Sequence, residues 1–107
     1  MKDMQLIHFG KNTCLINRKK GSYFFVGGIF STLELEPDLP ATDHCGRCRL
    51  CIDACPTSAI LEPHQTGLSR HIVDSRRCIS YHTIENRGEI PSQIVEKMSG
   101  WVVGCDI

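Results

Sequence analysis

Apolar residues dominate the first part of the chain and form several short runs. Residues 13–16 and 23–30 are apolar, β-branched or aromatic, and a polar segment over residues 17–21 separates them. This pattern predicts two strands joined by a loop, and the second run is apolar enough for a strand covered on both faces. Residues 33–36 alternate leucine and glutamate, which predicts a half-exposed strand ending at Pro37.

A polar and proline-containing linker over residues 38–42 divides the chain near Pro40. Beyond it we expect a short strand around residues 59–61. Asp74 is a suitable N-cap for a helix that runs through Cys78 to about Glu85. Pro91 suits the first turn of a further helix to Met98, which Gly100 would end.

Four cysteines in this second part form a motif with specific chemistry. Cys45, Cys48, Cys51 and Cys55, followed by Pro56, match C-x2-C-x2-C-x3-C-P, the bacterial ferredoxin pattern for a [4Fe–4S] cluster. Such a tight loop can turn several thiolates onto one cluster while its backbone N–H groups face the cluster sulfurs. The motif predicts a protein that handles electrons.

The fourth cysteine of such a motif ligates the other cluster in two-cluster ferredoxins, and this rule sorts the ligands. Cluster one would take Cys45, Cys48 and Cys51; cluster two would take Cys55, Cys78 and Cys105. Each set holds three thiolates where a cubane takes four. A second C-x2-C-x3-C-P motif opening at Cys105 would supply both missing ligands beyond Ile107, so we expect the chain to be an internal fragment.

Composition excludes several other classes of site. Zinc sites usually separate two C-x2-C pairs by a dozen or more residues, and a disulfide scaffold requires secretion, for which the chain shows no signal region. No apolar stretch has the length of a membrane span. Net charge is zero, which gives no global electrostatic argument for nucleic-acid binding. We therefore expect reduced cysteines in a cytoplasmic protein.

Beyond the cysteines, the chain resembles epoxyqueuosine reductase over almost its whole length. The matching stretches are Gly10-Lys11-Asn12-Thr13, Leu33-Glu34-Leu35-Glu36-Pro37-Asp38, His44-Cys45-Gly46, Arg76-Arg77-Cys78-Ile79-Ser80-Tyr81 and Gly104-Cys105-Asp106. That family reduces epoxyqueuosine in tRNA to queuosine, using cobalamin and two [4Fe–4S] clusters. The resemblance implies an α+β fold. Residues 1–40 would be the last strands of a nitroreductase-like cobalamin domain, and residues 41–107 a ferredoxin-like iron–sulfur domain.

The resemblance also implies partners and site residues. Ser80 and Asp106 would face the corrinoid, tRNA would be the substrate carrier, and an external donor would supply electrons. The family's acidic proton donor lies upstream of the Gly-Lys-Asn-Thr stretch, so the catalytic residue is unknown here. The segment over residues 63–71 is longer than expected of the family. We expect the chain by itself to lack the reductase activity.

For several other residues the sequence predicts only a structural or surface position. Cys14 suits a small core position, His44 should pack near the cluster without ligating it, and Trp101 should pack near the second cluster. His64, His71 and His82 are expected on the surface.

Three alternatives stay open. The first is a simple two-cluster ferredoxin-type electron carrier, and the second is another cobalamin-dependent enzyme such as a reductive dehalogenase-like protein. The third is a degenerate gene fragment without function.

Overall fold

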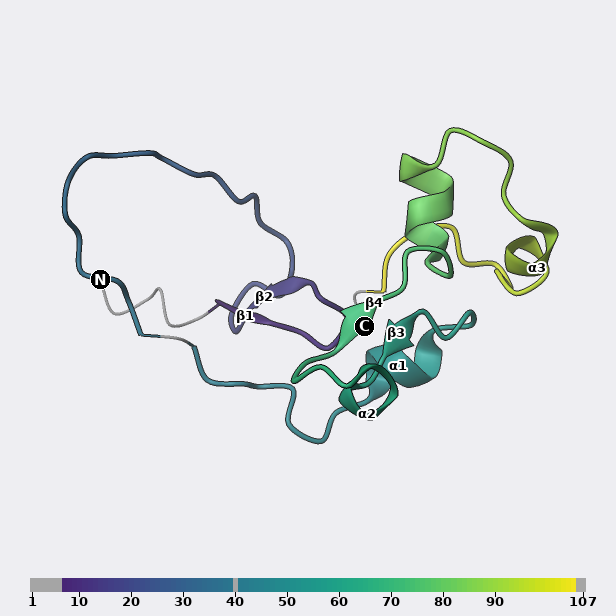
Figure 1. Cartoon of the computed structure of the whole chain (residues 1–107), viewed down its shortest axis with the longest axis horizontal. Helices are drawn as coiled ribbons and strands as arrows, with labels where there is room; N and C mark the ends of the chain where they lie inside the picture. Colours follow the sequence, from purple (N-terminus) through teal and green to yellow (C-terminus); the bar gives the residue numbers. More distant parts are fainter. Residues whose placement is uncertain (1–6, 40, 106–107) are drawn as a thin grey trace.

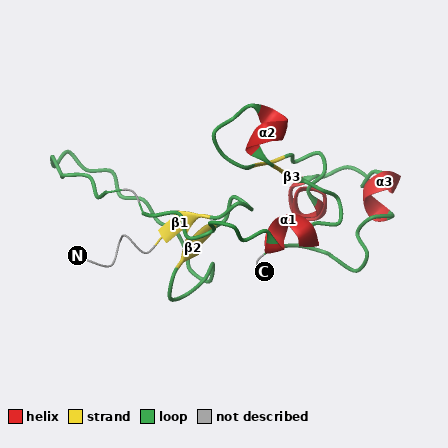
Figure 2. Ribbon diagram, turned by 90° about the horizontal axis from the view of Figure 1, so that it is seen from below, coloured by secondary structure: helices red, strands yellow, loops and turns green. Residues whose placement is uncertain are grey.

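Short helices and strands, connected by long irregular segments, make up the computed structural model, which describes residues 7–39 and 41–105. The elements in chain order are β1 (Ile7–Phe9), β2 (Leu15–Asn17), α1 (Leu50–Ala54), β3 (Ile60–Leu61), α2 (Pro63–Thr66), β4 (Ile72–Val73), the π-helix η2 (Tyr81–Glu85) and α3 (Ser92–Val95). The strands form two separate antiparallel pairs, β1 with β2 and β3 with β4 (Figures 1 and 2). The α+β class is confirmed, while the finer ferredoxin-like and nitroreductase-like assignments stay predictions.

The β1–β2 hairpin carries the Gly-Lys-Asn-Thr stretch in its turn. His8 pairs with Ile16, and Phe9 pairs with Leu15. Asn12 Oδ1 accepts the backbone N–H of Cys14 at 3.2 Å, and this short-range bond spans Thr13, whose φ of 64° is unusual for a β-branched residue. The predicted strand over residues 13–16 is therefore displaced to Leu15–Asn17, because its first two residues form the turn.

Gly10 is required by close packing in this turn. A Cβ at Gly10 would lie 2.5 Å from Asn12 Oδ1 and 2.7 Å from Ile16 Cδ1. We expect Gly10→Ala to lower the free energy of unfolding by about 1–3 kcal/mol, the usual cost of overpacking. Urea denaturation of the cluster-loaded protein measures it. Gly27→Ala is the matched control, because a Cβ there meets nothing within 4 Å; equal losses in both variants would contradict this account.

The β3–β4 pair lies directly after the cysteine motif. Ile60 pairs with Val73 and Leu61 with Ile72, so the strand predicted around residues 59–61 is confirmed. The connection between them is ordered by α2, where Glu62 and Gln65 form a reciprocal capping box and Gly67 ends the helix at φ 72°. The segment over residues 63–71 therefore begins with a capped helix and connects the two strands of this pair.

The last part of the chain differs from the predicted helices in its boundaries. Asp74 does not cap a helix through Cys78: its Oδ1 accepts the N–H of Arg76 at 3.1 Å and closes a turn, and η2 follows at Tyr81–Glu85. The predicted helix over residues 91–98 is only Ser92–Val95, since tighter turns replace it up to Met98 before Ser99 and Gly100 adopt positive φ. Side-chain bonding by Asp74 thus competes with regular helix at the first place, and backbone bonds of three-residue span replace it at the second.

The predicted strands at residues 23–30 and 33–36 are wrong. Residues 22–39 form a wide irregular loop that projects from the remainder of the chain (Figure 1). A strand needs a hydrogen-bonding neighbour, and the described residues supply none for this segment. Its large apolar side chains are exposed, with Phe25 and Phe30 wholly so.

Little of the chain is buried overall. The radius of gyration is 16.4 Å, against about 13 Å for a compact domain of this length. The accessible surface is 8966 Å², against roughly 6000 Å² expected for a compact protein of this mass. Among the described residues, the buried apolar ones are Ala59, Ile60, Ile79 and Ile94, and the first three line a cavity together with several cysteines. Among the described residues, none of the helices has the length and apolar character needed to cross a bilayer.

Candidate iron–sulfur centre

The loop that begins the cysteine motif is held by side chains from elsewhere in the chain. Lys11 Nζ, from the hairpin turn, donates to the carbonyl oxygens of Gly46 at 2.7 Å and Cys48 at 2.8 Å. Asp43 Oδ1 accepts the N–H of Cys45 at 2.8 Å. Gly46 has a φ of 42°, so the motif needs glycine there for its backbone conformation. Lys11 therefore ties the first part of the chain to the cluster loop, a role the sequence did not reveal.

Four of the six predicted ligands line one cavity of about 220 Å³. Cys51 and Cys55 come from α1 and the residue after it, while Cys78 and Cys105 come from the last part of the chain. Cys45 and Cys48, predicted for cluster one, are not part of this lining. The cavity thus brings together the proposed cluster-two set, and it also includes Cys51, which was assigned to cluster one.

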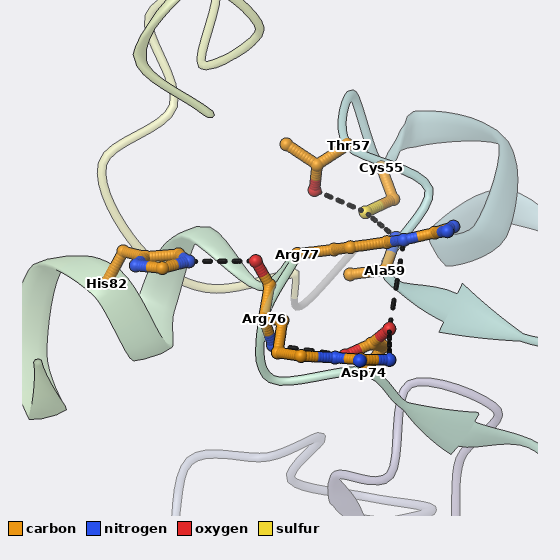
Figure 3. A network of polar contacts seen from close by, with 7 residues as sticks. All are labelled: Cys55, Thr57, Ala59, Asp74, Arg76, Arg77 and His82. Atoms are coloured by element: carbon orange, nitrogen blue, oxygen red, sulfur yellow. Dashed lines mark hydrogen bonds and ion pairs between the residues drawn. The ribbon is translucent and has the colours of Figure 1, made fainter. Parts of the chain in front are cut away.

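The thiol groups in this cavity lie in different electrostatic surroundings. Burial raises the pKa of Cys51, and the nearby Cys45 raises it further. Burial also acts to raise the pKa of Cys55, but hydrogen bonds donated by Ala59 and Thr57 outweigh it, so the pKa is lowered. The N–H of Ala59 lies 3.3 Å from Cys55 Sγ, and Thr57 Oγ1 lies 3.6 Å from it (Figure 3). Cys55 is thus surrounded by groups that stabilise a thiolate.

The cysteines are arranged around a space and do not point at one position. Among the described residues, no three His, Cys, Asp or Glu side chains converge closely enough to hold one ion. In a [4Fe–4S] cubane each thiolate binds a different iron atom, so the sulfurs surround the cluster instead of meeting at a point. Cys45, Cys48, Cys51, Cys55 and Cys78 form no disulfide. The donor set is all sulfur, which is the chemistry that iron–sulfur clusters take.

Asn12 connects the hairpin to the other side of the cavity. It is 6% exposed, and its Nδ2 donates to the carbonyl of Cys105 at 3.1 Å. Lys11 and Asn12, neighbours in one turn, therefore hold opposite parts of the cysteine framework. Asn12 thus has two roles, a short-range bond within the turn and a long-range bond to Cys105.

Two histidines lie beside Cys45. His8 is buried on β1, its Nε2 is 4.0 Å from Cys45 Sγ, and its ring meets that of His44 edge-on at 5.1 Å. His44 is exposed and bonds with Thr42, consistent with packing near the loop. The position of His8 could not be foreseen, because the strand pairing that brings it there is not encoded in a recognisable motif.

The remaining predicted residues occupy varied positions. Ser80 and Trp101 line the cavity, and Ser80 Oγ accepts the N–H of Gly104 at 2.8 Å; Asp106 lies outside the described residues. Cys14 is half-buried and also lines the cavity. His64 is exposed and His71 half-buried. The surface prediction for His82 is wrong: it is buried, because its Nε2 bonds with the carbonyl of Arg76 at 2.9 Å (Figure 3).

Comparisons with known proteins agree with this site. Residues 44–107 match the model of the 4Fe–4S double cluster binding domain. Over 92% of its length the chain is 50% identical to proteins named epoxyqueuosine reductase from Gloeobacter violaceus and Synechocystis sp., covering 29% and 32% of those relatives. A protein of the same name from Xanthomonas campestris pv. campestris is 50% identical over 91% of the chain and is covered to 25%.

The chain thus spans only about a quarter to a third of the length of these curated relatives. No solved structure matches it. The resemblance drawn from the motifs is confirmed by the names and identities of the relatives. The chain belongs to the 4Fe–4S double cluster binding family, and its curated relatives are epoxyqueuosine reductases.

Proposed function

We propose that this chain is the iron–sulfur electron-transfer portion of an epoxyqueuosine reductase. The observation that carries the proposal is the single cavity whose lining includes Cys51, Cys55, Cys78 and Cys105. All four cysteines lie within the segment that matches the double cluster family. When bound, [4Fe–4S] clusters accept and release single electrons at potentials that their surroundings tune.

The chain's own residues hold and tune such clusters. Cys45, Cys48 and Cys51 would hold one cluster, and Cys55, Cys78 and Cys105 the other, with a fourth ligand for each from another source. The donors to Cys55 Sγ stabilise negative charge on that sulfur. Lys11 and Asn12 fix the distance between the loop after Cys45 and the segment at Cys105.

Cobalamin and tRNA enter the proposal only through the relatives. Sites for drug-sized ligands take about 300–1,000 Å³, so a cavity of 220 Å³ cannot enclose a corrinoid. Any cobalamin contact of this chain would therefore lie outside the cysteine cavity. Ser80 and Asp106 stay predicted contacts at its edge. The proton donor for reduction of epoxyqueuosine to queuosine is not assigned to any residue of this chain.

The exposed apolar segment over residues 22–39 favours this proposal over a self-contained ferredoxin. Its side chains include Tyr23, Phe25, Ile29 and Phe30, each almost fully exposed. Large exposed apolar side chains gathered in one segment are typical of a surface that packs against a partner. A simple electron carrier has no use for it, whereas a segment of a larger reductase would pack it against further structure.

A chimaera tests the proposal directly. The matched segment of the Gloeobacter violaceus relative is replaced by the corresponding residues of this chain, and conversion of epoxyqueuosine in tRNA is measured. We expect the chimaera to convert its substrate, and a Cys78→Ser version to lose at least about 99% of that activity, because electron supply stops. A chimaera that carries both clusters yet converts nothing would contradict the proposal.

A further inference from the structure

A second hollow of the molecule, on the far side of the Cys55 loop, has a different chemistry from the cysteine cavity. It is a cleft of about 560 Å³, and its polar and charged lining includes Thr57, Ser58, Asp74, Arg76, Arg77 and Lys97. Three cations and one carboxylate give it a net charge of about +2. We call it the basic cleft. The chain as a whole has zero net charge, so this is a local concentration of positive charge.

The cations of the basic cleft face solvent, whereas its carboxylate does not. The side chains of Arg76 and Arg77 are 86% and 54% exposed, and that of Asp74 is 10% exposed. Arg76 Nε and Nη2 each donate to the carboxylate of Asp74 at 2.9 Å, and Arg77 Nε lies 3.8 Å from it (Figure 3). The less exposed carboxylate of Asp74 therefore orients the two guanidinium groups. The surface that an approaching partner contacts is positively charged.

The basic cleft is also directly connected to predicted cluster ligands. Thr57 lies two residues after Cys55, and Arg77 immediately precedes Cys78. The N–H of Asp74 donates to the carbonyl of Ala59 at 2.8 Å, and the N–H of Ala59 donates to Cys55 Sγ. The two turns that form the cleft are thus joined to each other and to the ligands. A partner seated in it would lie against the turns that carry Cys55 and Cys78.

From these observations we infer that the basic cleft is the docking site for an acidic electron-donor protein, an inference that rests on the proposed electron-transfer function. Electron transfer slows steeply with distance, so a donor needs a surface close to a cluster. Such encounters use small interfaces, and complementary charge speeds their association. A nucleic acid would instead call for a longer row of cations, since its binding typically neutralises many phosphates.

The test measures reduction of the clusters, not turnover. The cluster-loaded, oxidised protein is mixed anaerobically with a reduced acidic flavodoxin, and loss of cluster absorbance is followed over a range of salt concentrations. We expect Arg77→Glu with Lys97→Glu to lower the second-order rate at low salt by about tenfold or more and to flatten its salt dependence. Lys97→Glu alone should lower it by about threefold.

Matched controls isolate the docking step. Arg18→Glu with Lys20→Glu makes the same change of charge on the exposed turn after β2 and should leave the rate nearly unchanged. Reduced methyl viologen, a small cation, should reduce every variant at least as fast as the unaltered protein. Iron content verifies that each variant retains its clusters.

Two outcomes would overturn the inference: an equal loss of rate in the control pair, or an unchanged flavodoxin rate in the cleft variants. If the unchanged rate is accompanied by lost affinity for tRNA, the cleft is a nucleic-acid site instead. If methyl viologen fails to reduce even the unaltered protein, the proposed function fails instead, so the two failures are distinguishable.

Discussion

Replacing Cys78 with serine is expected to remove one cluster and leave the other, so that bound iron falls by about half. Cys55→Ser should remove the same cluster, because the cysteine before Pro56 is predicted to cross over to the second site. Cys48→Ser should remove the other one. Mössbauer and EPR spectra of the three variants distinguish the clusters by the signal that each variant loses.

Cys14→Ser is the matched control for these variants. Cys14 lines the same cavity as Cys51, Cys55 and Cys78, yet it lies in the hairpin turn outside the cluster motif. Its replacement should leave iron content unchanged. Loss of as much iron from Cys14→Ser as from Cys78→Ser would show that the ligand set is wrong, and loss of one common signal from Cys48→Ser and Cys55→Ser would refute the crossover.

Asn12→Leu should cost about 2–4 kcal/mol of stability, because it leaves two backbone groups without their partner in a largely buried place. These are the carbonyl of Cys105 and the N–H of Cys14. The expected result is a lower urea midpoint of the cluster-loaded protein. Hydrogen exchange at Cys14 and release of iron during denaturation should report the same loss.

An Asn12→Asp variant separates the two bonds of this side chain. Aspartate keeps the oxygen that accepts from Cys14, but it replaces the N–H donor with a buried carboxylate oxygen that faces the carbonyl of Cys105, so it should cost at least as much as Asn12→Leu. Gln93→Leu, an exposed change on α3, should have little effect. If Asn12→Leu were as stable as Gln93→Leu, the connection between the hairpin and Cys105 would not contribute to stability.

The cysteine framework and some local structure could be predicted from the sequence, because they depend on near neighbours. The spacing of Cys45 to Cys55 predicts the cluster type that the family match supports. Ile60 and Leu61 form the short strand expected of an apolar pair. The division near Pro40 is untested, and residue 40 lies outside the described residues.

Features that depend on distant contacts could not be predicted. Lys11 reaches the carbonyls of Gly46 and Cys48 across 35 and 37 positions, which no local pattern reports. The apolar pattern of residues 23–30 predicts burial, but a strand forms only where a neighbouring strand completes its hydrogen bonds. The burial of His82 could not be predicted because its hydrogen-bond partner is the backbone carbonyl of Arg76. Every residue has such a carbonyl, so the sequence gives no sign of which one a histidine will contact.

The most direct test of the central claim is Mössbauer spectroscopy of the anaerobically prepared protein, combined with measurement of its iron, sulfide and zinc. We predict iron and sulfide in equal amounts, with spectra typical of [4Fe–4S] clusters that become paramagnetic on one-electron reduction. Variants lacking Cys45, Cys48 and Cys51 together should lose one of the two cluster signals. A colourless protein with stoichiometric zinc and no bound sulfide would contradict the assignment of this chain as an iron–sulfur electron-transfer protein.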